Sequence, residues 1–307
     1  ENNCTEIKEF YIVTFATGDQ PLVFILFFLL YITGVVVNSA VITVISLDPH
    51  LHTPLYLFLY NLSIVDLSST TVIIPKLLDM LLFGTNTISL DQCFTQVYFF
   101  FFAGSSEDLL LFTMAYDRYV AICRPLHYSH LFRRRNCVLF VVSIWVSSAL
   151  NSVLFTLATS NMSFCHSNIV QQFYCDAKAL TRISCGGTEL FYIVTCLEIF
   201  IFGICPFTCS FTSYIKMIKI IMEIKSKDGR RKAFSTCSSH LTVILLYYTT
   251  GVCVYMMPPS AGASTLDVVF TVLFTTVTPM LNPLIYSLRN QDVKVALKRL
   301  IGVKVLS

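Results

Sequence analysis

The chain has 307 residues, of which 55% are hydrophobic and only 13% are charged, and its formal net charge is +3. About a quarter of the residues of a soluble domain are charged, so this composition excludes an ordinary soluble protein and indicates a membrane protein. The small net charge gives no reason to expect a nucleic acid as partner.

Seven stretches are long and apolar enough to cross a bilayer, which takes about 20 residues in a helix. We therefore predict an all-α membrane protein, a bundle of seven transmembrane helices between an N-terminal tail at 1–21 and a C-terminal region at 289–307, with the bundle domain at 22–288. Residues 1–20 lack a basic start and an apolar core, so no cleavable signal peptide is expected. The expected spans are 22–46, 55–80, 94–122, 137–160, 190–220, 234–258 and 265–288.

The basic residues predict how the bundle is oriented. Of the 21 lysines and arginines, 17 lie at 118–135, 216–232 and 289–304. Basic loops stay on the cytoplasmic side. With seven spans, the N-terminus then lies outside and the C-terminus inside, as expected for a multi-pass protein of the plasma membrane.

The N-terminal tail contains Asn3-Cys4-Thr5, which matches the acceptor sequence for N-glycosylation. Because the tail is expected outside, we predict a glycan on Asn3. A second match at Asn161 also lies outside, and the sequence leaves its modification open.

Polar side chains at membrane depth define a candidate cation site. Ionisable groups at this depth face a protein interior or a water-filled cavity, and two acids on neighbouring spans either share a proton or bind a cation. A small hard cation such as sodium suits carboxylate and amide oxygens, and no other cofactor is expected. The alternative is a protonated carboxyl pair without an ion. The residues of the candidate site are Asn38, Asp66, Glu107 and Asn282.

An acid and an arginine stand side by side where the third span reaches the cytoplasm, within Met-Ala-Tyr-Asp-Arg-Tyr at 114–119. One interpretation is an ordinary helix-end ion pair with a snorkelling Arg118. The other is a switch, in which Asp117 holds Arg118 until a cytoplasmic partner takes it. Two tyrosines of the fifth and seventh spans lie at a similar depth. The candidate switch and coupling residues are Asp117, Arg118, Tyr119, Tyr214 and Tyr286.

Four cysteines besides Cys4 lie on the outer face, at the start of the third span and in the loop at 161–188. In an oxidising environment they imply two disulfides, and the sequence leaves three pairings open. Cys4 would be left over. The four are Cys93, Cys165, Cys175 and Cys185.

Beyond the seventh span, Val293, Leu297, Leu300 and Ile301 recur at helical spacing, with lysine and arginine off that stripe. This pattern predicts a short amphipathic helix on the inner membrane surface.

Four segments of the chain, at 51–66, 114–123, 232–241 and 279–290, resemble the odorant receptors, a branch of the rhodopsin-like G-protein-coupled receptors. Ser-Thr-Cys-Ser-Ser-His at 235–240 is typical of that branch. The resemblance implies a receptor whose activation releases Arg118 and admits a stimulatory, olfactory-type heterotrimeric G protein, raising cyclic AMP. It also implies disulfides between Cys93 and Cys175 and between Cys165 and Cys185.

The sequence departs from the family pattern at several points. Tyr247-Tyr248-Thr249 stands where Phe-Tyr-Gly is common, and Gln172 stands where some members have a histidine proposed to bind metal, which argues against copper or zinc there. Asp108 is a second acid beside Glu107, and the sequence offers no account of it.

The resemblance places the ligand between the third, fifth, sixth and seventh spans, toward the outside. An apolar, aromatic lining with a few hydroxyl groups suits a small hydrophobic odorant, bound at about micromolar affinity. Glu198 is the exception: it is either a protonated acid bonded to a neighbour or facing lipid headgroups, or it selects a basic or hydrogen-bond-donating odorant. The candidate ligand positions are Phe100, Phe101, Gly104, Ser105, Glu198, Phe202, Gly251, Val252, Tyr255, Thr271 and Thr275.

Other function classes fit the sequence less well. A transporter tends to show inverted repeats and paired broken helices, but no motif occurs twice. An enzyme is not expected, because no nucleophile–base pair or metal-ligand cluster falls at one depth. The alternative within receptors is a non-olfactory rhodopsin-like receptor for a small lipid or metabolite.

Overall fold

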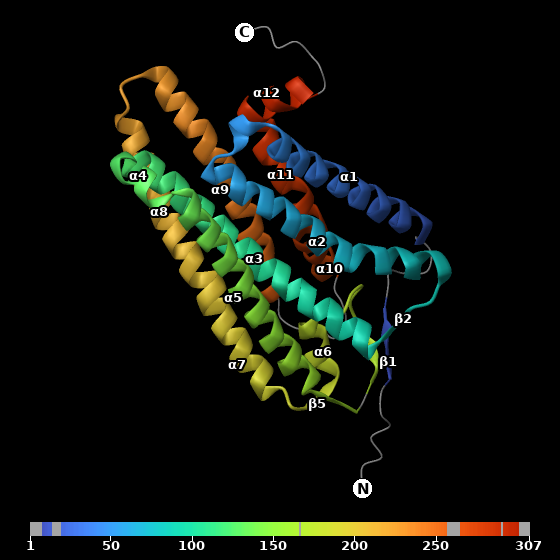
Figure 1. Ribbon diagram of the computed structural model, residues 1–307. Coiled ribbons are helices and arrows are strands. Elements are labelled where there is room, and N and C mark those ends of the chain that lie inside the picture. The colour runs from blue at the N-terminus through green and yellow to red at the C-terminus, as the bar shows by residue number, and fades with distance from the viewer. Residues whose placement is uncertain (1–7, 14–19, 166, 257–264, 290, 301–307) are drawn as a thin grey trace.

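The computed structural model describes residues 8–13, 20–165, 167–256, 265–289 and 291–300, and these residues form a helical bundle (Figure 1). Seven of its helices are long and apolar enough to cross a membrane, which confirms the predicted fold class. All the predicted spans lie within these helices, except that the sixth was expected to run to residue 258 and the described helix stops at Met256. The spans are α1 (Gln20–Leu47), α2 (Pro54–Phe83), α3 (Leu90–Cys123), α5 (Arg134–Ser160), α7 to α8 (Glu189–Glu198 and Cys205–Glu223), α9 (Lys227–Met256) and α10 to α11 (Thr265–Val272 and Thr278–Arg289).

Local signals set the ends of these helices. Ser89 begins α3, because its hydroxyl accepts a hydrogen bond from the backbone N–H of Gln92 at 3.3 Å. Gly84 ends α2 in the left-handed conformation, with φ of 70°, and its N–H bonds to the carbonyl of Met80. Two short elements, η1 (Pro49–Leu51) and α4 (Pro125–Leu131), occupy the turns at the inner end.

Helix α3 runs through the middle of the bundle and contacts α2, α5 and α8 (Figure 1). The buried apolar side chains form two clusters, one in the inner half and one in the outer half. A hydrogen bond of 3.2 Å from the indole N–H of Trp145 to the amide oxygen of Asn61 ties α5 to α2 in the inner part.

Two of the spans contain a π-helical segment: η2 (Ile199–Ile204) joins α7 to α8, and η3 (Leu273–Val277) joins α10 to α11. A π turn holds one residue more than an α turn, so the side chains that follow are rotated by about 100° from a regular helix. Such segments often occur at functional sites.

The outer end of the bundle is covered by a cap of short strands and one helix. Strand β1 (Glu9–Ile12) pairs antiparallel with β2 (Thr87–Ser89) and parallel with β4 (Ile169–Val170). The side chains of Phe10 and Ile12 point inward and are fully buried, whereas Glu9 and Tyr11 are exposed, as the alternation of a strand requires. The outer cap also contains β3 (Ser163–Phe164), β5 (Ser184–Gly186) and α6 (Ala177–Ile183).

The expected C-terminal helix is present as α12 (Gln291–Leu300), with the basic residues Lys298 and Arg299 in its last turn. Val293 and Ala296 are buried against the bundle, whereas Leu297 is 40% exposed. The side chain of Leu300 and all of Ile301 lie outside the described residues. Two contacts hold α12 to the inner end of the bundle. The hydroxyl of Tyr56 donates a hydrogen bond to Asp292 at 3.1 Å, and Arg299 forms an ion pair with Asp48 at 3.4 Å.

Candidate functional site

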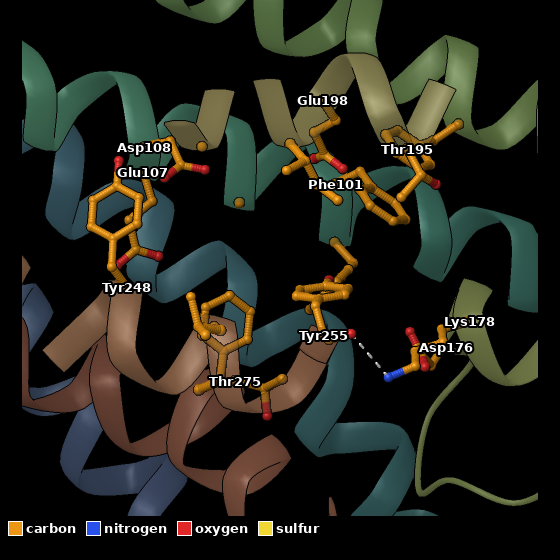
Figure 2. A pocket seen from close by; sticks show the side chains of 18 of the residues that line it. Phe101, Glu107, Asp108, Asp176, Lys178, Thr195, Glu198, Tyr248, Tyr255 and Thr275 are labelled. Carbon is orange, nitrogen blue, oxygen red and sulfur yellow. Dashed lines mark hydrogen bonds between the residues drawn. The ribbon is translucent and has the colours of Figure 1, made fainter. Parts of the chain in front are cut away.

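A cavity of about 650 Å³ lies in the outer half, between α3, α7 to α8, α9 and η3 and below α6 (Figure 2). Its walls are mostly aromatic and aliphatic. Phe101 of α3 stacks on Phe155 of α5, with ring centroids 3.7 Å apart, and forms one side of the cavity. The other aromatic lining residues are Phe100, Phe191, Tyr192, Phe207, Tyr247, Tyr248, Tyr255 and Phe274.

Most of the candidate ligand positions line this cavity. They come from α3, the end of α7, α9 and η3, which are the four walls expected from the sequence. Ser105, Phe202 and Thr271 are not among the lining residues. Those that do line it are Phe100, Phe101, Gly104, Glu198, Gly251, Val252, Tyr255 and Thr275.

Ser105 and Thr271 are turned toward other partners. The hydroxyl of Ser105 is fully buried and accepts a hydrogen bond from the amide of Asn151 at 2.7 Å, so it joins α3 to α5. The hydroxyl of Thr271 donates to the carbonyl of Asp267 at 2.6 Å and lies 3.4 Å from the amide nitrogen of Gln172 in the outer loop.

Phe202 does not line the cavity for a different reason: it lies inside the π-helical segment η2. The sequence expectation used regular α-helical spacing from Glu198, which the extra residue of the π turn breaks. The cavity is instead reached from this segment by Ile199, Gly203 and Ile204.

The mouth of the cavity is formed by residues of the outer loop that the sequence reasoning missed. The ammonium group of Lys178 donates to the backbone carbonyls of Val254 at 3.0 Å and Tyr255 at 3.4 Å, so it bridges from the outer cap to the end of α9 (Figure 2). Asp176, Thr181 and Arg182 complete the mouth. No periodic pattern marks such loop positions, and only their closeness to Cys175 could have pointed to them.

Burial changes the acidity of two groups at this mouth. Asp176 begins α6, and its carboxylate accepts the backbone N–H of Ala179 at 3.2 Å. Burial raises the pKa of the Asp176 carboxyl although this hydrogen bond opposes the shift. Burial also lowers the pKa of the Lys178 ammonium, with Asp176 acting in the other direction.

The deep part of the cavity is acidic. Glu107, Asp108 and Glu198 all line it, and the hydroxyl of Tyr248 faces Asp108 (Figure 2). The hydroxyl of Tyr247 donates to the backbone carbonyl of Gly104 at 3.2 Å.

Three of the four candidate cation ligands are brought together. The amide nitrogen of Asn282 lies 2.8 Å from the carboxylate of Glu107 and 3.2 and 3.3 Å from the two oxygens of Asp66, and all three side chains are buried. The amide of Asn38 instead donates to the carbonyls of Gly34 and Pro279, at 3.0 and 3.3 Å, and ties α1 to α11.

The donor set is compatible with a hard cation. Two buried carboxylates meet there, and the amide oxygens of Asn38 and Asn282 have no hydrogen-bond partner among the described residues. Oxygen atoms of this kind are the ligands that sodium-like cations prefer. Asn282, however, presents its nitrogen to the two acids, and a cation would require its oxygen.

At the inner end, Arg118 is bound by Asp117. The Nε atom of Arg118 donates to the Asp117 carboxylate at 2.8 Å, and the hydroxyl of Tyr128 on α4 donates to the other carboxylate oxygen at 2.9 Å. The Asp117 side chain is fully buried. Burial, with Asp117 next, raises the pKa of the Tyr128 hydroxyl.

The tyrosines expected near Arg118 occupy two kinds of position. Tyr214 and Tyr286 are buried, and their hydroxyl groups have no hydrogen-bond partner in the described part of the chain. The ring of Tyr286 packs edge-on against His240, with centroids 4.7 Å apart. Tyr119 faces α8 instead, where Lys216 lies 6.0 Å from its ring centre.

Both implied disulfides are present. Cys93 bonds to Cys175 and joins the start of α3 to the outer loop, and Cys165 bonds to Cys185 within that loop. The structure confirms these pairings. Asn3, the candidate glycosylation site, lies outside the described residues.

Comparison with known proteins identifies the family. A family model described as "Olfactory receptor" matches residues 27–304. Olfactory receptor 1S1 of Homo sapiens is 44% identical over 312 residues, which cover 100% of this chain and 95% of the human protein. Olfactory receptor 1E16 of Mus musculus is 42% identical over 301 residues, covering 97% of this chain and 96% of the mouse protein. Because the similarity runs from the first span to the C-terminal helix, this chain belongs to the olfactory receptor family, whose members are odorant-sensing G-protein-coupled receptors of the plasma membrane and not enzymes.

Proposed function

We propose that this receptor binds a small hydrophobic volatile in the outer cavity and activates a stimulatory, olfactory-type heterotrimeric G protein, which raises cyclic AMP. The cavity carries the proposal. Its volume of about 650 Å³ lies within the range of about 300–1,000 Å³ typical of small-molecule sites, and its walls are mainly aromatic and aliphatic.

The inner end supports the transducing half of the proposal. Buried hydroxyl groups without partners cost about 1–3 kcal/mol each. Among the described residues, Tyr214 and Tyr286 carry such groups, close to α3 and α9. A rearrangement that frees Arg118 from Asp117 would let these hydroxyls find partners. We therefore favour the switch over the snorkelling side chain as the role of Arg118.

The polar cluster of Asp66, Glu107 and Asn282 is proposed to hold a sodium ion in the inactive receptor, with one shared proton as the alternative. Two buried carboxylates close together need a neutralising charge. Sodium should raise the unfolding temperature of the purified receptor over that in an equal concentration of choline, and Asp66→Asn should abolish the difference. Equal unfolding temperatures in the two salts would favour the proton.

The test of the proposed function is a screen of a chemically broad odorant panel on cells that express the receptor, with cyclic AMP as the readout. A hit should also promote nucleotide exchange on a purified stimulatory G protein. Exchange on a different G-protein class with no rise in cyclic AMP would overturn the proposed coupling and leave the cavity assignment in place.

A further inference from the structure

The charges in the outer cavity are unevenly distributed. Its basic lining residues, Lys178 and Arg182, both belong to the outer loop at the mouth. The ammonium group of Lys178 is already engaged by carbonyls at the end of α9. One acid, Asp176, lies beside these basic residues in the same loop. The acids Asp108 and Glu198 lie instead on the membrane-spanning helices that form the deep walls, where the lining contains no basic residue among the described residues.

Asp108 has unused hydrogen-bonding capacity in this cavity. Its carboxyl group is contacted by the side chains of Tyr248 and Tyr247, and the hydroxyl of Tyr248 faces it (Figure 2). Its Oδ1 atom is buried and has no hydrogen-bond partner in the described part of the chain. A buried acceptor without a partner is costly, and binding sites are where such costs are tolerated.

Glu198 is held almost as loosely. Its only hydrogen bond among the described residues comes from the amide of Asn151, at the long distance of 3.5 Å, and that amide makes a much shorter bond of 2.7 Å to Ser105. Glu198 is the last residue of α7, directly before the π-helical segment, and its carboxyl group points toward the cavity (Figure 2).

We propose that Asp108 and Glu198 form an amine-binding site, and that the ligand of this receptor is a small apolar molecule carrying a protonated amino group. The inference rests on the proposed function, since it names the ligand class of the same cavity. An ammonium group supplies both a hydrogen-bond donor for Oδ1 of Asp108 and the positive charge that two acids in one low-dielectric cavity need.

The rest of the cavity suits the remainder of such a ligand. The stacked rings of Phe101 and Phe155 offer an apolar wall for a hydrocarbon body. Aromatic faces also attract a cation, as the lining tyrosines Tyr248 and Tyr255 can do beside the acids. The nearby Glu107 is already bound by Asn282, so it belongs to the cation cluster and not to this site.

The test measures binding directly on the purified full-length receptor, by the shift in unfolding temperature with millimolar ligand. Matched probes separate charge from shape: benzylamine against benzyl alcohol, and cyclohexylamine against cyclohexanol. The amines should stabilise the receptor and the alcohols should not, since a ligand that binds only the folded state stabilises it. Asp108→Asn and Glu198→Gln should each weaken amine binding about ten-fold or more, which corresponds to ~1.4 kcal/mol.

Two variants act as controls. Asp91→Asn removes an exposed acid from the same helix, outside the cavity, and should leave amine binding as in the wild type. Asp108→Glu keeps the charge and should retain amine binding where Asp108→Asn loses it, which separates recognition from a general loss of folding. Alcohols that bind as well as the amines, or amine binding unchanged in Asp108→Asn and Glu198→Gln, would overturn the inference.

Failure of the amine site can be distinguished from failure of the proposed function. If neutral volatiles raise cyclic AMP and the amines do not bind, the amine site is wrong and the receptor function stands. If amines bind through Asp108 but no G protein exchanges nucleotide, the site stands and the proposed coupling fails.

Discussion

The two halves of the bundle are built in opposite ways. The outer half is hollow around a cavity of about 650 Å³, and two disulfides and a small sheet hold it in shape. The inner half is filled with packed side chains, its cysteines Cys123, Cys137 and Cys237 are free, and the ion pair of Asp117 and Arg118 lies near the end of α3.

This difference indicates how one chain can combine a ligand-binding region with a region that transmits the signal to a G protein. In the outer half, one disulfide ties the start of α3 to the loop over the cavity and the other closes that loop on itself. The inner half has no such ties among the described residues; the ion pair of Asp117 and Arg118 lies there, together with buried hydroxyl groups that have no partner in the described part of the chain. Covalent ties are therefore concentrated around the cavity proposed to bind the ligand, and not at the end proposed to dock the transducer.

The largest effect is expected from removing the covalent tie of the outer half. The Cys93–Cys175 bond closes a loop of 82 residues, so Cys93→Ser should cost about 2–5 kcal/mol of stability and remove most receptor from the cell surface. Cys165→Ser opens a loop of only 20 residues and should cost less. Antibody labelling of intact cells measures both, and a larger loss for Cys165→Ser would contradict the account.

The second test breaks the inner half alone. Arg118→Ala should reduce ligand-dependent nucleotide exchange to background while the receptor stays at the surface, because the arginine is proposed to bind the transducer. Asp117→Asn removes the partner that holds Arg118 and should raise exchange without ligand. Signalling by Arg118→Ala at wild-type strength would show that the ion pair is only structural.

The third test fills the outer cavity. A Cβ atom added at Gly104 meets no atom within 4 Å, so Gly104→Leu places its side chain in the space meant for the ligand. We expect a loss of about ten-fold or more in ligand potency, read as a shift of the cyclic AMP dose–response curve. Gly251→Ala is a milder counterpart, because its Cβ would lie 3.3 Å from the ring of Phe274. Unchanged potency in Gly104→Leu would place the ligand elsewhere.

The smallest effect concerns the mouth of the cavity. Because the folded-state pKa of Asp176 is raised, the folded receptor holds its proton more tightly than the unfolded chain does. The stabilisation should therefore be fully present below the ordinary carboxyl pKa and be lost as pH rises from there through the raised pKa. Asp176→Asn keeps an oxygen for the N–H of Ala179 and should lack this slope. Unfolding temperatures of both proteins from neutral to mildly acidic pH make the comparison.

Much of the architecture could be predicted because it follows from rules that act along the chain. The membrane spans could be predicted from the length of the apolar stretches; the stretch 55–80, for example, lies within α2. The cavity-lining residues of α3 and α9 could be predicted because both helices keep regular α-helical spacing there. Phe101 and Gly251 therefore lie on the cavity side of their helices.

The site residues that the sequence did not predict correctly lie where an irregular helix or loop decides which side chains reach the cavity. The π-helical segment moved the wall from Phe202 to Gly203 and Ile204, and spacing rules assume no such turn. The loop residues at the mouth depend on a disulfide and on contacts between distant segments. Asp108 was visible as an unexpected second acid, but its meaning required knowing that Glu198 shares the same cavity.

Strand β1 sets a constraint on the order of biosynthesis. It is made before any of the helices, yet its parallel partner β4 emerges roughly 160 residues later, about 8–30 s afterwards at usual translation speeds. Its antiparallel partner β2 is made in between, so Phe10 and Ile12 gain cover from β2 first and from β4 last. The three-stranded sheet can therefore be completed only after the first four spans have been made.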